Sequence, residues 1–203
     1  MTTGKQACGP NYPWADREFT MSDSERFDPF NNRLCRDVRN ALSVAFIAAL
    51  MQQDMRPVQK AADDFAADTL PEMVRTYIDK RLAAYANVAA SLRRQPATDP
   101  LAVAFRIWDD GLFFETHEYL EEFWMGAEGE RKKLLQAVIR AAGTYVHLEQ
   151  GNIKGAARIA AKAIEGLKPR QDQLSRYIDA KRLLEKLGSL DPVPPTLSGT
   201  KRE

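Results

Sequence analysis

The spacing of apolar residues between positions 31 and 188 most constrains how this chain can fold. Apolar side chains recur there roughly every three or four residues, and no long window alternates between apolar and polar residues as a strand does. Prolines at the expected helix starts and glycines after the expected helix ends divide the region into segments. We therefore predict an all-α protein of about seven helices, arranged as antiparallel helical hairpins in an orthogonal or tetratricopeptide-like bundle.

Four regions follow from the same pattern. Residues 1–27 and 189–203 contain several prolines and show no helical period, so we predict a flexible N-terminal arm and a C-terminal tail there. Residues 28–95 are expected to form an N-terminal helical region and residues 99–188 a second helical domain. The sequence leaves open whether residues 28–95 are a separate domain or complete one continuous bundle. Three aromatic residues of the arm are expected to dock onto the helical body: Tyr12, Trp14 and Phe19.

Composition excludes several classes of protein. With 44% hydrophobic and 28% charged residues, the chain of 203 residues is typical of a globular protein that can bury a core without disulfides. A net charge of +1 argues against a general nucleic-acid binder. The longest apolar stretch, residues 44–51, is far shorter than the roughly 20 residues that a membrane span needs. Cys8 and Cys35 lack ligand spacing and no secretory signal is visible, so we predict a cytoplasmic protein.

The charges are distributed unevenly along the second helical domain. Residues 107–130 contain eight acidic residues and no Lys or Arg, whereas residues 131–187 contain thirteen Lys or Arg and five Asp or Glu. This contrast favours the packing of the two segments against each other. The only two histidines, His117 and His147, fall one in each segment.

The expected helix over residues 112–125 places His117 and Glu121 one turn apart in the middle of its apolar face, beside Trp124. A carboxylate on a buried face costs several kcal/mol unless it is paired, so we expect Glu121 to be buried and paired with His117. The other glutamates of this helix are expected on the opposite, solvated side: Glu115, Glu118 and Glu122.

The next expected helix, residues 130–150, carries a stripe at steps of three and four residues: Gln136, Arg140, Gly143 and His147. A short turn at residues 126–129 makes the two helices an antiparallel hairpin. If the stripe faces the first helix, His117, Glu121 and His147 converge as metal ligands, with Gln136 and Arg140 supporting them. Zinc accepts such a set with an open position, and iron, manganese or nickel are alternatives.

Several sequence runs resemble the domain-of-unknown-function 309 (DUF309) family: residues 111–124, Leu135-Gln136, Tyr145-Val146-His147 and Gly151-Asn152. His117, Glu121 and Trp124 match the HxxxExx(W/Y) motif of that family, and Glu118 matches its acidic residue after the histidine. The resemblance covers about residues 99–188. It implies an all-helical fold and a motif suggested to bind metal, with Glu118 and Trp124 lining the pocket, but it implies no reaction.

Two hypotheses of different classes remain. In the first, the protein binds a metal or a small ligand at this site, without an assignable reaction, and we favour a non-enzymatic role. In the second, it is a tetratricopeptide-like interaction module whose His–Glu pair is purely structural, with Arg140 neutralising Glu121. The small residues between Tyr145 and Pro169 suit that packing. A protein partner or a second copy of the chain fits the second hypothesis, and neither a membrane nor nucleic acid is expected as a partner.

Overall fold

The computed structural model of the chain describes residues 26–66 and 69–198. These residues are mostly helical and contain no strand, which confirms the predicted all-α class. The bundle fits the expected size of about seven helices, since α8 is only a single turn. The helices are α1 (Arg33–Gln52), α2 (Arg56–Ala66), α3 (Glu72–Arg94), α4 (Pro100–Asp109), α5 (Phe113–Met125), α6 (Gly129–Glu149), α7 (Ile153–Leu167), α8 (Gln171–Leu174) and α9 (Ala180–Ser189), with a 3₁₀ turn at Lys168–Arg170.

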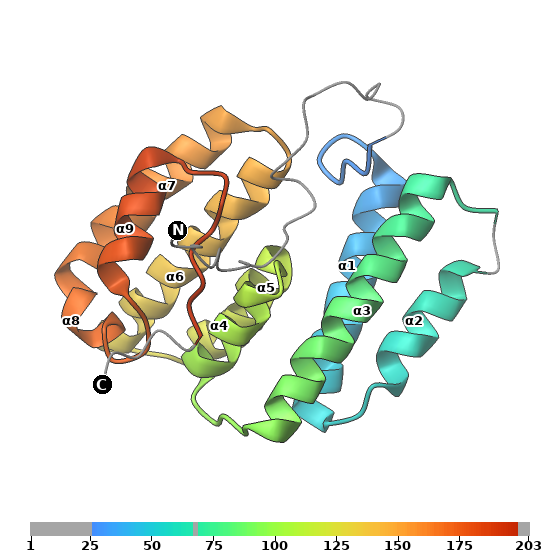
Figure 1. The fold of residues 1–203 in the computed structure, drawn as a ribbon, viewed down its shortest axis with the longest axis horizontal. Helices are drawn as coiled ribbons and strands as arrows, with labels where there is room; N and C mark the ends of the chain where they lie inside the picture. The colour runs from blue at the N-terminus through green and yellow to red at the C-terminus, as the bar shows by residue number, and fades with distance from the viewer. Residues whose placement is uncertain (1–25, 67–68, 199–203) are drawn as a thin grey trace, which may run out of the picture.

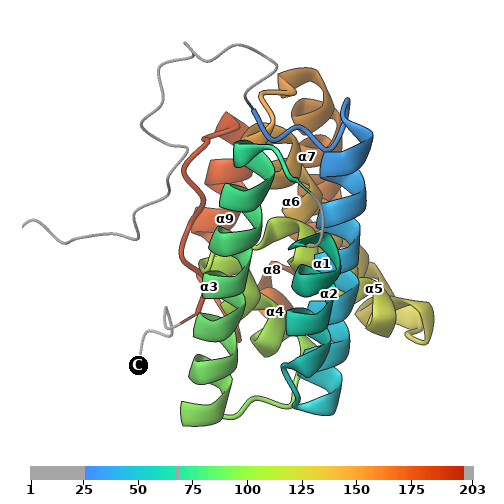
Figure 2. The same ribbon diagram turned by 90° about the vertical axis from the view of Figure 1, so that its right-hand side faces the viewer.

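Helix α5 occupies the middle of the molecule. It packs against α6 on one side and against α1 on the other, while α3 contacts α4. Figure 1 shows α1, α2 and α3 together beyond α5, and α6, α7 and α9 on its opposite side. Figure 2, turned by 90°, shows α1, α2 and α3 nearest the viewer, with α5 extending beside α1. Both long faces of α5 are therefore covered by other helices.

One continuous hydrophobic core joins the two groups of helices. The rings of Phe46 on α1 and Tyr85 on α3 stack with centroids 4.1 Å apart. Trp108 on α4 meets Phe113 and Tyr145 edge-on at 5.0 Å each, and such aromatic pairs add to the stabilisation from buried area. The predicted boundaries at residues 28–95 and 99–188 stay a prediction.

Helices α6 and α7 approach each other closely at two glycines. A Cβ atom added to Gly166 would lie 2.8 Å from the Cβ of Ala137, and one added to Gly155 would lie 2.5 Å from His147 Nδ1. A side chain at Gly166 would therefore force the two helices apart, and one at Gly155 would displace the His147 ring. The α6–α7 pair depends on glycine at both contacts.

The described part of the predicted C-terminal tail packs along α4. The indole Nε1–H of Trp108 donates to the Pro195 carbonyl at 2.9 Å. The carboxylate of Asp109 accepts from the backbone N–H groups of Leu197 and Ser198, each at 2.6 Å.

Most of the predicted N-terminal arm, including Tyr12, Trp14 and Phe19, lies outside the described residues. No helix within residues 26–66 and 69–198 combines the length and the apolar character that a membrane crossing requires.

Candidate metal centre

Helix α5 presents a histidine between two carboxylates. His117 Nδ1 lies 3.1 Å from Glu118 Oε1, and His117 Nε2 lies 3.6 Å from Glu121 Oε1, one turn further along the helix. One ligand atom from each of the three residues lies within 4.8 Å of the other two. Within the described part of the chain, this is the one group of His, Cys, Asp or Glu residues that is close enough to share a metal ion.

His117 lies where α5 meets α6. A Cβ atom on Gly143 of α6 would lie 3.9 Å from His117 Cδ2, so Gly143 of the predicted stripe does face α5. The ring of Phe114 lies parallel to the His117 ring, with centroids 6.5 Å apart. The guanidinium of Arg39 on α1 covers the Phe114 ring at 3.8 Å. Aromatic and helical surfaces therefore restrict the His117 ring, and its two polar neighbours lie on its own helix.

The three side chains are accessible to solvent. The exposed fractions of the side chains are 29% for His117, 33% for Glu118 and 45% for Glu121. A metal held by these groups would keep positions open to water or to a small ligand, as catalytic rather than closed structural metal sites do.

The expected burial of the glutamates on α5 is wrong at two positions. Glu121, expected to be buried, is partly exposed, and Glu115, expected to be solvated, has no exposed surface. The expectation of one apolar face on this helix holds only if α5 is covered by α6 alone. Because α1 and α3 cover the opposite face, Glu115 points into the protein interior.

Glu115 is held by two residues of α3. The Tyr85 hydroxyl donates to Glu115 Oε1 at 2.7 Å, and Arg81 Nε lies 3.6 Å from the same oxygen. The Arg81 guanidinium also donates to the carbonyl of Gly111 at 3.1 Å, directly before α5. Burial and the neighbouring Glu115 raise the pKa of Tyr85 well above its ordinary value. Burial alone would lower the pKa of Arg81, but attraction to Glu115 outweighs it and the pKa rises.

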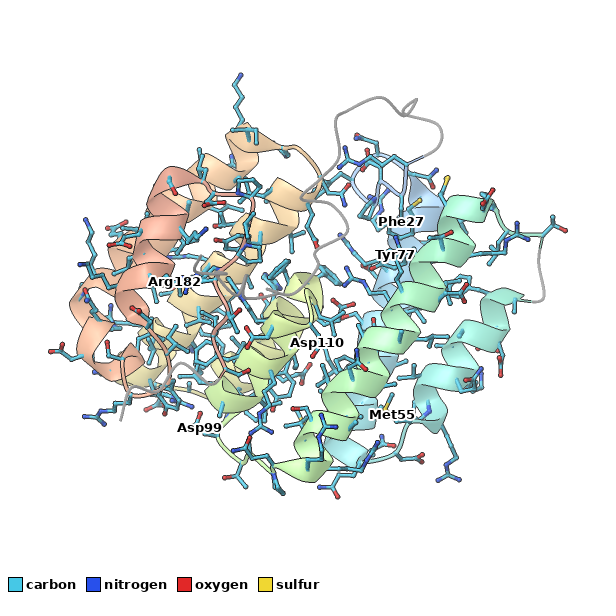
Figure 3. All side chains as sticks on the ribbon, viewed as in Figure 1. Phe27, Met55, Tyr77, Asp99, Asp110 and Arg182 are labelled. Atoms are coloured by element: carbon cyan, nitrogen blue, oxygen red, sulfur yellow. The ribbon has the colours of Figure 1, made fainter. Side chains whose placement is uncertain are left out.

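Two further, partly buried residues extend this cluster. Desolvation raises the pKa of Glu149, at the end of α6, to about 7. Attraction to the positive charge of Arg81 opposes this rise, and repulsion from Glu115 adds to it. Tyr77 on α3 stacks on Phe27 with ring centroids 3.6 Å apart, and its desolvated hydroxyl has a raised pKa (Figure 3). Tyr77 Oη and Glu115 Oε2 have no hydrogen-bond partner among the described residues.

His147 lies outside the group around His117. Its ring stacks on Phe30 with centroids 5.0 Å apart, and its Nδ1 is directed at the backbone of Gly155 on α7. Desolvation lowers the pKa of His147, and the positive charge of Arg158 lowers it further.

Three other predicted pocket residues are partly buried: Trp124, Gln136 and Arg140. The Trp124 ring packs under the Lys132 ammonium at 5.0 Å, and no hydrogen bond among the described residues joins Gln136 or Arg140 to His117.

Residues 101–159 match the family model described as Domain of unknown function (DUF309). Over these residues, called the DUF309 segment below, the chain is similar to that family. The match runs from α4 into α7, so it contains His117, Glu118, Glu121 and His147. It confirms the resemblance found in the sequence, over a shorter range than the predicted residues 99–188. No curated protein and no solved structure matches the chain.

The buried cluster couples the DUF309 segment to the N-terminal helices. Tyr85 and Arg81 were not predicted, because no local pattern on α3 distinguishes them from residues of an ordinary amphipathic helix. Glu115 carried no such signal either, because the residues that follow it, Thr116, His117 and Glu118, are polar. Chemically, the cluster is a closed ionic network, whereas His117 with Glu118 and Glu121 is an accessible set of metal-ligand groups.

Proposed function

We propose that the protein binds a divalent metal ion through His117, Glu118 and Glu121 on α5. The observation that carries this proposal is the approach of three ligand atoms to within 4.8 Å of one another on a partly exposed helix surface. One imidazole and two carboxylates suit zinc, iron or manganese, and nickel is accommodated less readily because imidazole is the only nitrogen donor.

The arrangement of the three side chains supports a mononuclear site. His117 and Glu121 are one helical turn apart, so they present their donor atoms on the same side of α5. Glu118 Oε1 lies 3.1 Å from His117 Nδ1, and one ligand atom of Glu118 lies within 4.8 Å of those of the other two residues, so Glu118 supplies the third ligand. The predicted role of His147 as a ligand is not part of this proposal, because its ring packs between Phe30 and α7.

The decisive experiment measures metal binding by untagged, metal-free protein with isothermal titration calorimetry, using Zn²⁺, Mn²⁺ and Fe²⁺ as probes. We expect one equivalent of metal to bind. His117→Ala should weaken binding by more than about 100-fold, since even partners of ligands typically contribute 10- to 100-fold. Glu121→Gln should weaken it strongly as well.

Two matched controls separate this site from other carboxylates and imidazoles. Glu122→Gln changes an exposed neighbour on α5, and His147→Ala removes the only other imidazole. Both variants should bind metal as the wild type does. Absence of stoichiometric binding, or equal loss in the control variants, would overturn the proposal.

The competing function is an interaction module with a structural His–Glu pair. In that case His117→Ala lowers the midpoint of thermal unfolding without changing metal binding. The partial exposure of Glu121 favours the metal, because a structural pair gains little free energy where solvent screens the charges. We place the protein in the cytoplasm, where its buried free thiol, Cys35, stays reduced.

A further inference from the structure

A cavity of about 540 Å³ lies between the end of α3, α4, the turn after α8 and the C-terminal segment. We propose that this cavity binds a small organic phosphate. Its polar lining comes from four separate parts of the chain: Ser91, Gln95, Arg106, Arg176, Tyr177 and Ser198. This proposal is independent of the metal site.

The charge of the lining points to an anion. Both ionised residues in it are arginines, Arg106 and Arg176, and none is acidic. Arginine offers a planar fork of donors that matches the oxygens of phosphate or carboxylate groups. Two guanidinium groups balance a phosphate monoester, which carries a charge of about −1.5 to −2 at neutral pH, better than a single carboxylate.

Two carboxylates that hydrogen-bond to residues of the cavity lining are already engaged. Asp99 accepts from the Tyr177 hydroxyl at 2.8 Å, from Arg131 at 3.0 Å and from the Leu101 N–H at 2.8 Å. Figure 3 marks Asp99 on the loop between α3 and α4. Asp109 is engaged by the C-terminal segment through Leu197 and Ser198. These contacts fix the walls of the cavity and engage both carboxylates that hydrogen-bond to its lining residues.

The two arginines differ in what they do for the fold. Arg106 donates to the main-chain carbonyl of Gln95 and so closes the end of α3 against α4. No hydrogen bond or ion pair of the Arg176 guanidinium is found within residues 26–66 and 69–198. Arg176 therefore offers its donors to a ligand, and replacing it should leave the fold intact.

The size and the remaining lining indicate an organic molecule rather than a free ion. Ligand pockets typically measure about 300–1,000 Å³, and this cavity falls within that range. The rings of Tyr177 and Phe105 meet edge-on at 6.2 Å and form an aromatic wall. Ser91, Ser198 and Gln95 add neutral hydrogen-bonding groups that suit a sugar or a heterocycle.

The test uses the full chain and four probes in titrations followed by NMR: AMP, ribose 5-phosphate, inorganic phosphate and adenosine. We expect AMP and ribose 5-phosphate to shift the resonances of Gln95 and Tyr177, and inorganic phosphate and adenosine to bind more weakly than either. Arg176→Gln should weaken AMP binding by about 10- to 100-fold, the contribution expected of hydrogen bonds to a charged group.

Arg75→Gln is the matched control, because Arg75 is exposed in the first turn of α3, at the opposite end from the cavity. It should bind AMP as the wild type does. The proposal is overturned if no organic phosphate binds at millimolar concentration, if adenosine or inorganic phosphate binds as tightly as AMP, or if Arg75→Gln and Arg176→Gln have equal effects.

Discussion

The hydroxyl group of Tyr85 donates a 2.7 Å hydrogen bond to the carboxylate of Glu115, a side chain with no exposed surface. Tyr85 belongs to α3, and Glu115 belongs to α5 of the DUF309 segment. Arg81, one turn before Tyr85, places its positive charge 3.6 Å from the same carboxylate oxygen. These contacts fix the N-terminal helices in one position on the DUF309 segment, which apolar packing alone would specify less strictly.

Tyr85→Phe should destabilise the protein by about 1–3 kcal/mol, because it leaves a buried carboxylate oxygen without its donor. Urea unfolding followed by circular dichroism measures the change. Tyr119→Phe is the control: Tyr119 is also a buried residue, 5% exposed, but no hydrogen bond of its hydroxyl is found in the described part of the chain. Equal losses in the two variants would contradict the role assigned to the Tyr85–Glu115 bond.

Glu149 should make stability depend on pH. Its pKa is about 7 in the folded protein, against an ordinary value of 4.5. The folded state therefore gains a contribution that is complete below about pH 4.5 and is lost as the pH rises through about 7. As the pH rises from about 4.5 to above 7, the free energy of unfolding of the wild type should fall by up to about 3 kcal/mol relative to that of Glu149→Gln.

Urea unfolding of both proteins between about pH 4.5 and pH 8 measures this difference. In the difference between the two free energies of unfolding, the contributions of all other carboxyl groups cancel, because both proteins contain them. A wild-type profile parallel to that of Glu149→Gln would show that the Glu149 carboxyl ionises as freely in the folded chain as in the unfolded one.

Gly166→Ala should destabilise the α6–α7 pair. The new methyl group would lie 2.8 Å from the Cβ of Ala137, which is fixed to its own helix backbone and cannot rotate away. Overpacking of this kind typically costs about 1–3 kcal/mol, more than the roughly 1 kcal/mol that alanine gains over glycine in a helix. Gly188→Ala on α9 is the control, because no atom lies within 4 Å of its added methyl group. The midpoint temperature of thermal unfolding should fall for Gly166→Ala. For Gly188→Ala it should stay the same or rise.

The helices could be predicted from sequence because their apolar spacing and their end signals are local. Asn32, Asp99 and Asn152 cap α1, α4 and α7 by accepting from backbone N–H groups two or three residues later. The position of α1 and α3 on α5 is a long-range property that no local spacing encodes. For this reason the exposure of Glu115 and Glu121 was predicted the wrong way round.

The candidate site could be predicted in part. The i,i+4 spacing places His117 and Glu121 on one side of a helix wherever that helix packs, so their approach follows from sequence. The position of His147 depends on the rotation of α6 and on the ring of Phe30, which belongs to the segment before α1. Glu118 faces His117 through a side-chain conformation that the helix period does not determine.

Metal binding at His117 is tested most directly by locating the ion. Crystals of the full chain grown with Zn²⁺ and measured at the zinc absorption edge give an anomalous difference map of every bound zinc. We predict a peak within bonding distance of a His117 ring nitrogen and of carboxylate oxygens from Glu118 or Glu121. At zinc saturation, a map without a peak at His117, or with its only peak elsewhere in the molecule, would contradict the proposed function.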